Sequence, residues 1–155
     1  MNQGPVLLAY DGSAHARAAI ERAGAVLQHG PAVVATAWTS FEGAAPAALL
    51  ALPGEMVRDS VHLLDGAGRE TAEELAAEGA ELARAAGFDG ESRAVRCSGP
   101  FFAGLLETAD ELDARAIVAG SRGRSSLAAA VLGSVSTGLL HHTRRAVLIV
   151  RAEGA

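Results

Sequence analysis

Five strand-like segments alternate with segments of helical periodicity, and this alternation is the clearest pattern in the sequence. The strand-like segments span residues 6–10, 32–38, 91–97, 116–119 and 146–151. The third of them alternates polar and apolar residues, which is typical of an edge strand. A strand, a helix and a further strand in succession imply parallel pairing with right-handed crossovers. The pattern therefore predicts an α/β fold with a five-stranded parallel sheet and helices on both faces.

Apolar residues at helical spacing predict helices in four segments, namely 13–29, 60–86, 100–112 and 134–142. Ser13 is expected to cap the first helix, and Pro100 is expected to occupy the first position of the third. The second helix is expected to be interrupted at residues 66–68, where the sequence reads Gly-Ala-Gly.

Residues 39–59 form the least regular part of the pattern. They are rich in Ala, Gly and Pro, and Pro46 and Pro53 punctuate them. We expect a long connection with one helical turn near residues 47–52. Connections of this length often cover a functional site, so we hypothesise that the segment is a flap over a ligand pocket.

The composition fits one domain over residues 1–155, because half of the residues are apolar and can form a core. The single cysteine, Cys97, cannot form an internal disulfide and is expected to be buried. The sequence shows no signal-peptide pattern, and its apolar runs are far shorter than the roughly 20 residues of a membrane span. We therefore expect a cytoplasmic protein that does not bind a membrane.

Charge narrows the possible chemistry further. The formal net charge is −5, which argues against nucleic-acid binding, and all 13 basic residues are arginine. The absence of lysine excludes Schiff-base chemistry and a P-loop lysine, so a phosphate would have to be bound by arginine, hydroxyl groups or backbone amides. The histidines are scattered and form no cluster with cysteine, so no metal site is expected.

A glycine-rich loop after the fourth strand is the most informative segment. Two residues separate Gly120 from Gly123, nine separate Gly123 from Gly133, and Ser134 then begins a helix. Glycines allow close approach of an anion, and a helix N-terminus offers unpaired amides and a favourable dipole. The hydroxyl of Ser136 adds a donor. The spacing alone also fits a surface loop with a capping serine.

With this motif the chain resembles the nucleotide-binding branch of the universal stress protein family, which carries Gly-x2-Gly-x9-Gly-Ser/Thr at this place. Residues 6–13 are similar to the family's first strand and turn, and residues 146–150 to its last strand. The resemblance implies a Rossmann-like, adenine nucleotide alpha hydrolase-like fold. It also implies binding of ATP or another adenine nucleotide, with Mg²⁺ or Mn²⁺ held mainly by phosphate oxygens and water.

The resemblance assigns roles to individual residues. Asp11 would lie beside the adenine and ribose, although an Asp before Gly is also a common turn residue. Arg122 and Arg124 could neutralise phosphates or could be solvated loop residues. The expected nucleotide site comprises Ala9, Asp11, Trp38, Ala119, Gly120, Arg122, Gly123, Gly133, Ser134, Val135 and Ser136.

Three functions remain open from the sequence. The first is an ATP-binding stress-response protein that uses nucleotide occupancy as a conformational signal and has no catalytic residue. The second is a slow ATP hydrolase or adenylate-transferring enzyme, and the third is a nucleotide-free interaction module. The apolar final strand is expected near a sheet edge, where it would mediate a homodimer. A further protein partner would receive the signal.

Overall fold

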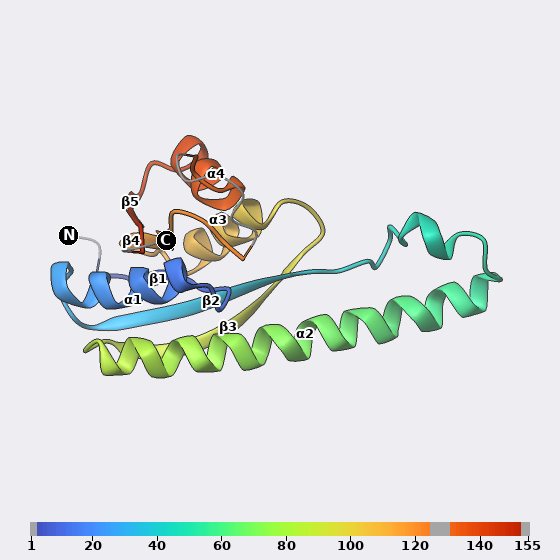
Figure 1. Ribbon diagram of the computed structural model, residues 1–155, viewed down its shortest axis with the longest axis horizontal. Helices are drawn as coiled ribbons and strands as arrows, with labels where there is room; N and C mark the ends of the chain where they lie inside the picture. The colour runs from blue at the N-terminus through green and yellow to red at the C-terminus, as the bar shows by residue number, and fades with distance from the viewer. Residues whose placement is uncertain (1–2, 125–130, 153–155) are drawn as a thin grey trace.

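The computed structural model describes residues 3–124 and 131–152, and it contains five parallel strands with helices between them (Figure 1). The sheet order is β3-β2-β1-β4-β5. The strands are β1 (Val6–Ala9), β2 (Pro31–Thr39), β3 (Asp89–Cys97), β4 (Ala116–Gly120) and β5 (Ala146–Val150). The helices are α1 (Ala14–Val26), η1 (Ala47–Leu49), α2 (Gly54–Ala85), α3 (Phe101–Glu111) and α4 (Ser134–His142).

Two apolar layers, one on each face of the sheet, confirm the predicted α/β architecture. On one face Leu8 and Val34 pack with the small apolar side chains of α1 and α2, such as Ala19 and Ala80. On the other face the strands pack against α3 and α4, where Leu139 is completely buried. Alanines on the helices bring their backbones close to the sheet. The low aromatic content is therefore consistent with a tightly packed core.

The strand order places a switch point beside β1, the central strand. The chain passes from β1 to β2 and β3 on one side and then returns to β4 and β5 on the other. Ligands of open parallel sheets bind beyond the carboxyl ends of the strands at such a point. β3 and β5 are the two edge strands, as the sequence pattern predicted for both.

β2 and β3 extend beyond their neighbours at the carboxyl edge of the sheet. β1 ends at Ala9, which pairs with Ala35, whereas β2 and β3 remain paired as far as Thr39 and Cys97. Trp38 therefore lies on a two-stranded extension past the end of the central strand. This extension forms one side of a hollow at the switch point.

The predicted interruption of the second helix is wrong. α2 runs without a break from Gly54 to Ala85 and has 32 residues, which corresponds to about 48 Å. Gly68 lies within the helix against Trp38, where a Cβ would be 3.4 Å from the indole ring. A single glycine weakens a helix by only about 1 kcal/mol. The regular helix on both sides of residues 66–68 therefore keeps α2 continuous there.

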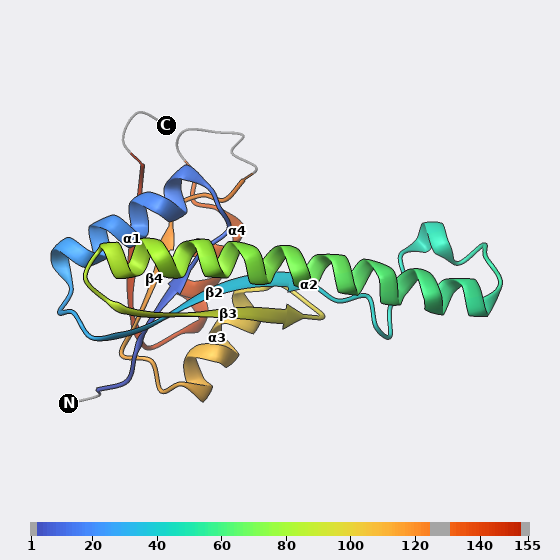
Figure 2. The same cartoon turned by 90° about the horizontal axis from the view of Figure 1, so that it is seen from below.

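The first half of α2 projects away from the sheet (Figure 2). Together with η1 and its flanking loops it forms an extension that we call the arm, residues 41–63. The helical turn expected near residues 47–52 is present as η1. α2 begins at Gly54, six residues before the predicted start, because Pro53 and the surrounding small residues resemble a loop.

The start of α1 agrees with the prediction, and the start of α3 differs from it by one residue. The Ser13 hydroxyl accepts a hydrogen bond from the Ala16 amide at 3.1 Å, so Ser13 caps α1 as expected. Pro100 is the N-cap of α3 and not its first helical residue, which is Phe101. Among the described residues, no helix is long and apolar enough to cross a membrane.

Candidate functional site

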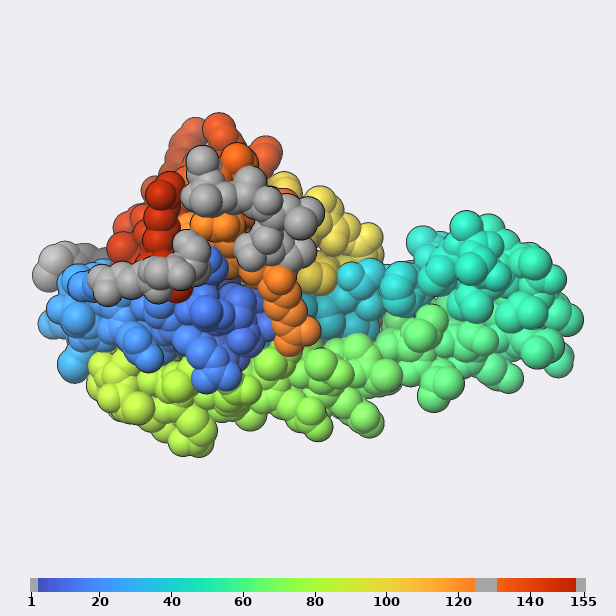
Figure 3. All heavy atoms as spheres, viewed as in Figure 1, coloured from blue at the N-terminus to red at the C-terminus, as the bar shows by residue number. Residues whose placement is uncertain are grey.

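A cavity of about 1020 Å³ opens at the carboxyl edge of the sheet, beside the switch point. In Figure 3 the segment after β4, drawn in orange, extends toward the green α2. Every residue predicted for the ligand site lies in the cavity wall: Ala9, Asp11, Trp38, Ala119, Gly120, Arg122, Gly123, Gly133, Ser134, Val135 and Ser136. Residues 125–130 of the predicted glycine-rich loop lie outside the described part of the chain.

The first turn of α4 is fixed to the end of β4 by hydrogen bonds. The Gly133 amide donates to the Ser121 carbonyl at 2.8 Å, and the Ser136 hydroxyl donates to the same carbonyl at 3.1 Å. Ser121 and Ser136 are both buried. Ser134 begins the helix and is exposed, and Gly133 provides no side-chain cap. The start of α4 therefore presents amide groups and one hydroxyl to the cavity.

The three motif glycines differ in how closely their neighbours approach them. A Cβ at Gly120 would lie 2.7 Å from the backbone carbon of His15, so α1 packs too closely for any side chain. A Cβ at Gly123 would lie 2.7 Å from Asp11 Oδ2. A Cβ at Gly133 would meet only ordinary contacts among the described residues, the nearest at 3.4 Å. Packing among the described residues therefore excludes a side chain at Gly120 and disfavours one at Gly123, but does not by itself require glycine at position 133.

Asp11 combines a turn role with an oxygen directed to the cavity. Its Oδ1 accepts a hydrogen bond from the Ser13 amide at 2.9 Å, which is the contact of a turn-forming aspartate. Its Oδ2 lies close to Gly123, and both residues line the cavity. The backbone carbonyl of Asp11 accepts from Arg124 Nε at 2.6 Å, so this arginine joins the glycine-rich loop to the first turn.

His15 connects the site to the end of the chain, a contact that sequence reasoning missed. The imidazole is buried, and its Nδ1 accepts a hydrogen bond from the Ala152 amide at 2.9 Å. Ser121 Oγ lies 3.3 Å from the same nitrogen. No local pattern separates His15 from the other scattered histidines, because Ser121 and Ala152 are more than 100 residues away along the chain.

Side chains of α2 and α3 also line the cavity, and none of them was predicted for the site. The side chains concerned include Leu64, Thr71, Leu75, Phe101 and Leu105. None of residues 39–59, all of which the structure describes, lines the cavity. The flap hypothesis for this segment is therefore wrong, because residues 41–59 belong to the arm, which projects away from the sheet (Figure 2). The part of α2 that follows the arm covers the cavity in its place.

The cavity has little capacity to bind a metal ion directly. Asp11 is the only acidic side chain among its described lining residues. No group of three His, Cys, Asp or Glu side chains in the described ranges could hold a metal ion. A divalent cation that arrived with a phosphate would therefore be coordinated mainly by phosphate oxygens and water.

Comparison with known proteins gives one family and a set of similar structures. A sequence model described as the universal stress protein family matches residues 4–151. No curated protein gives a significant match. Among solved structures, hypothetical protein MJ0577 has a TM-score of 0.78 at 18% identity, and each chain is covered over 100% of its length.

Two further similar structures contain a nucleotide. A universal stress protein in complex with cAMP has a TM-score of 0.62 at 28% identity, with 99% of this chain and 100% of that chain covered. The universal stress protein from Archaeoglobus fulgidus in complex with dAMP has a TM-score of 0.57 at 21% identity, with 97% and 99% covered. The fold of this chain is thus the Rossmann-like fold of these proteins.

Proposed function

The chain belongs to the universal stress protein family, and we propose that its cavity binds an adenine nucleotide, with ATP as the first candidate. The observation that carries the proposal is the glycine-rich segment at the start of α4. Gly123, Gly133 and Ser134 line the cavity there, so a ligand would meet backbone amides and one hydroxyl beside short side chains. The nucleotide complexes of similar proteins support the same ligand class.

In the proposed complex the phosphates lie at the N-terminus of α4. The amides of that turn and the Ser134 hydroxyl would donate to phosphate oxygens, and the helix dipole would favour the negative charge. Arg122, which lines the same cavity, would add positive charge. Mg²⁺ or Mn²⁺ would accompany a triphosphate, bound by its oxygens and by water.

The base and ribose would lie nearer β1 and β2. Ala9 and Trp38 line that part of the cavity, and Asp11 Oδ2 is available to accept a hydrogen bond from a ribose hydroxyl or an amino group. Ala119 and Gly120 would adjoin the ribose from the end of β4. These are short side chains, so the ligand would contact backbone along this edge.

We propose that nucleotide occupancy serves as a signal and that any hydrolysis of ATP is slow. α2 lines the cavity through residues such as Leu64 and Leu75 and then continues without a break into the arm. A ligand that changes the position of α2 would therefore change the position of the arm. A protein partner that contacts the arm would receive that signal.

Calorimetric titration of ATP with Mg²⁺ into the wild type, Gly123→Val and Gly99→Val tests the binding site. Gly99 is a matched control, because a Cβ there meets nothing within 4 Å and the residue does not line the cavity. We expect Gly123→Val to weaken binding at least about tenfold, or about 1.4 kcal/mol, since the side chain would displace Asp11. Gly99→Val should bind as the wild type does.

Other outcomes distinguish the remaining functions. Equal affinity in Gly123→Val and the wild type would remove the loop from the site. Absence of binding of ATP, AMP and cAMP to the wild type would favour the nucleotide-free interaction module. Steady phosphate release, or adenylate transfer to an acceptor, would favour the enzyme.

We also propose a homodimer formed through β5. This strand is at the edge of the sheet, and its residues Val147, Leu148 and Ile149 are only partly buried within one chain. Pairing with a second copy would satisfy the free edge and cover these side chains. Sedimentation that shows a monomer at all protein concentrations would contradict this proposal.

A further inference from the structure

The cavity contains apolar side chains that the chain itself leaves uncovered. Leu64, Phe101 and Val131 line it and have exposed fractions of 42%, 38% and 67%. They come from α2, from α3 and from the segment before α4, so three separate parts of the chain bring apolar surface to one place. Exposed apolar surface that gathers in this way usually marks a binding site.

These side chains are among six large apolar residues that line the cavity, which we call the apolar wall: Trp38, Leu64, Phe101, Leu105, Val131 and Leu132. Its members are distinct from the polar groups that the proposed nucleotide site uses. Asp11 follows β1, and Ser134 starts α4. Val131 is two residues before Gly133, so the apolar wall begins beside the proposed phosphate position.

An unsubstituted nucleotide would cover this wall only at Trp38. Its one apolar part is the base, which the proposed function places near Ala9 and Trp38. Its phosphate end is anionic and would lie at the start of α4, so it cannot bury Val131 or Phe101 without losing hydration. The volume of about 1020 Å³ is at the top of the range of roughly 300–1,000 Å³ that ligand pockets span, so space remains for a further group.

We propose that the natural ligand is an adenine nucleotide whose phosphate end carries an apolar acyl or alkyl chain, which packs against the apolar wall. This proposal rests on the proposed function and specifies its ligand class. The adenosine part would bind near β1, the phosphate at the start of α4, and the chain between Leu64, Phe101 and Val131. Burial of the chain would add affinity in proportion to its apolar area.

A homologous series of N-acylsulfamoyl adenosines, which are non-hydrolysable mimics of acyl adenylates, provides the test. Calorimetry would compare each member with AMP on the wild-type protein. We expect affinity to rise about fourfold for each methylene group that becomes buried, until the chain reaches the cavity mouth. Equal affinity for AMP and for every chain length would overturn the proposal.

Leu64 and Leu63 form a matched pair for the same measurement. Leu64→Ser should reduce the ratio of long-chain affinity to AMP affinity, because it removes part of the apolar wall. Leu63 is the neighbouring residue, 76% exposed and outside the cavity lining, so Leu63→Ser should leave that ratio unchanged. An equal reduction in both variants would contradict a role of the apolar wall.

Three control results separate this proposal from its alternatives. If neither AMP nor ATP binds, the proposed function fails and not only its extension. If an alkyl phosphate without adenosine binds as tightly as the acyl mimic, the nucleotide part of the proposal is wrong. If Leu64→Ser abolishes self-association while chain length has no effect, the wall is covered by a second copy of the chain and the proposed ligand is wrong.

Discussion

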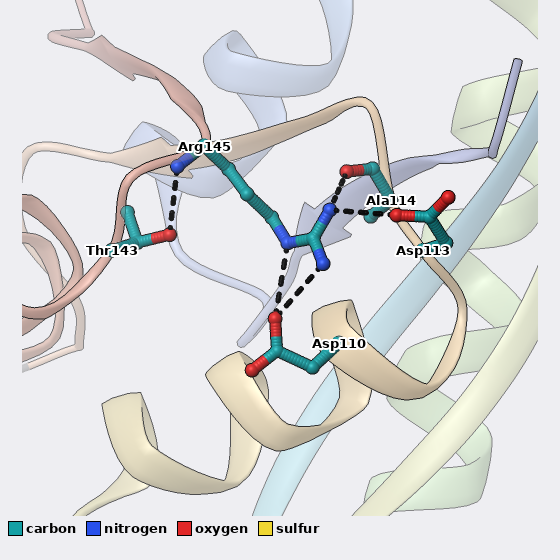
Figure 4. A network of polar contacts seen from close by, with 5 residues as sticks. All are labelled: Asp110, Asp113, Ala114, Thr143 and Arg145. Atoms are coloured by element: carbon teal, nitrogen blue, oxygen red, sulfur yellow. Dashed lines mark hydrogen bonds and ion pairs between the residues drawn. The ribbon is translucent and has the colours of Figure 1, made fainter. Parts of the chain in front are cut away.

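The guanidinium of Arg145 donates from two nitrogens to one carboxylate oxygen of Asp110, with Nε at 3.1 Å and Nη2 at 2.9 Å from Oδ1 (Figure 4). Its Nη1 donates to Asp113 Oδ1 at 3.2 Å and to the Ala114 carbonyl at 2.6 Å. One side chain thus ties the start of β5 to the end of α3 and to the turn that precedes β4. The hydrogen bond to Asp110, more than any other contact, raises the pKa of Arg145.

Replacement of Arg145 by methionine should lower the free energy of unfolding by about 1–2 kcal/mol, because two carboxylates and a carbonyl lose their donor. Arg145→Lys should recover only part of this loss, since an ammonium group cannot reproduce the planar contact. Arg144, the exposed neighbour, is a matched control, and Arg144→Met should change stability by less than about 0.5 kcal/mol. Urea unfolding measures all three, and equal effects at both positions would contradict the structural role of Arg145.

Tyr10 should titrate far above the ordinary range of a phenol. Burial first, and then its hydrogen bond to Glu78, raise the pKa of Tyr10 to about 12 from an ordinary 10.0. The pKa of Tyr10 is higher in the folded protein than in the unfolded one. The contribution of Tyr10 to the free energy of unfolding is therefore complete below pH 10.0 and is lost as the pH rises toward about 12. The chain has one tyrosine, so the phenolate absorbance reports this group alone.

A spectrophotometric titration of the folded protein should therefore have a later midpoint than one in denaturant. Tyr10→Phe should remove the alkaline loss of stability and should cost about 1–2 kcal/mol at neutral pH, since Glu78 loses a donor. Coincident midpoints in the folded and unfolded protein would show that Tyr10 is not buried as described.

Gly104 and Cys97 should show strong energetic coupling. A Cβ at position 104 would lie 2.5 Å from the Cys97 sulfur, and both residues are buried between α3 and β3. Gly104→Ala should therefore destabilise the protein by about 1–3 kcal/mol through overpacking. In a Cys97→Ala background the same change should cost much less, because the sulfur is absent and the next contact is 3.3 Å from Val95.

A double-mutant cycle by thermal or urea unfolding gives the coupling energy directly. Additive effects of the two substitutions would contradict the close approach of α3 to β3. Burial also raises the pKa of the Cys97 thiol, so its reaction with a thiol reagent should be slow in the folded wild type.

Asp65 should hold the base of the arm against the end of β2. Its Oδ1 accepts from the Phe41 amide at 2.8 Å and its Oδ2 from the Ser40 hydroxyl at 2.6 Å. The Phe41 contact first, and then the Ser40 contact, lower the pKa of Asp65 below 3.8. The stabilisation is therefore present above pH 3.8 and is lost as the pH falls through the lowered value.

Asp65→Ala should accelerate hydrogen exchange at the Phe41 amide and along the arm, while the sheet remains protected. Asp59, an exposed residue of the same helix, supplies the control substitution Asp59→Ala. Unchanged exchange at Phe41 in the Asp65 variant would show that other contacts hold the arm.

The strands and the order of elements could be predicted because their signals are local. Residues 6–9 and 116–119 are continuously apolar, as strands buried on both faces must be, and the loop between β4 and α4 carries its own glycine spacing. The arm could not be predicted, because its part of α2, residues 54–63, follows Pro53 and buries only Val61. Apolar periodicity cannot identify a helical segment that buries no apolar face.

The apolar half of the cavity also required the structure. Leu64 and Phe101 are 37 positions apart in the sequence, on helices that cover opposite faces of the sheet. Their proximity to one cavity depends on how far α2 extends past the sheet edge, which is a tertiary property. By contrast, the motif glycines are brought together by one loop, so their spacing was sufficient to identify them.

Two serines in the first turn of α4 should respond differently to removal of their hydroxyl groups. Ser136 is buried and donates to the carbonyls of Ser121 and Gly133, whereas Ser134 is exposed at the cavity. Ser136→Ala should lower the free energy of unfolding by about 1 kcal/mol, because it removes the hydrogen bonds of a buried hydroxyl, although both carbonyls keep a backbone amide donor. Ser134→Ala should change stability by less than about 0.5 kcal/mol.

Nucleotide affinity should show the reverse order, with a larger effect of Ser134→Ala than of Ser136→Ala. Ser134→Ala should weaken binding of ATP about fivefold through loss of one hydrogen bond to phosphate, and it should leave the affinity for adenosine unchanged because adenosine has no phosphate. Calorimetry with both ligands on each variant measures this difference. A Ser134→Ala protein that loses affinity for adenosine and ATP equally would place the base, and not the phosphate, at the start of α4.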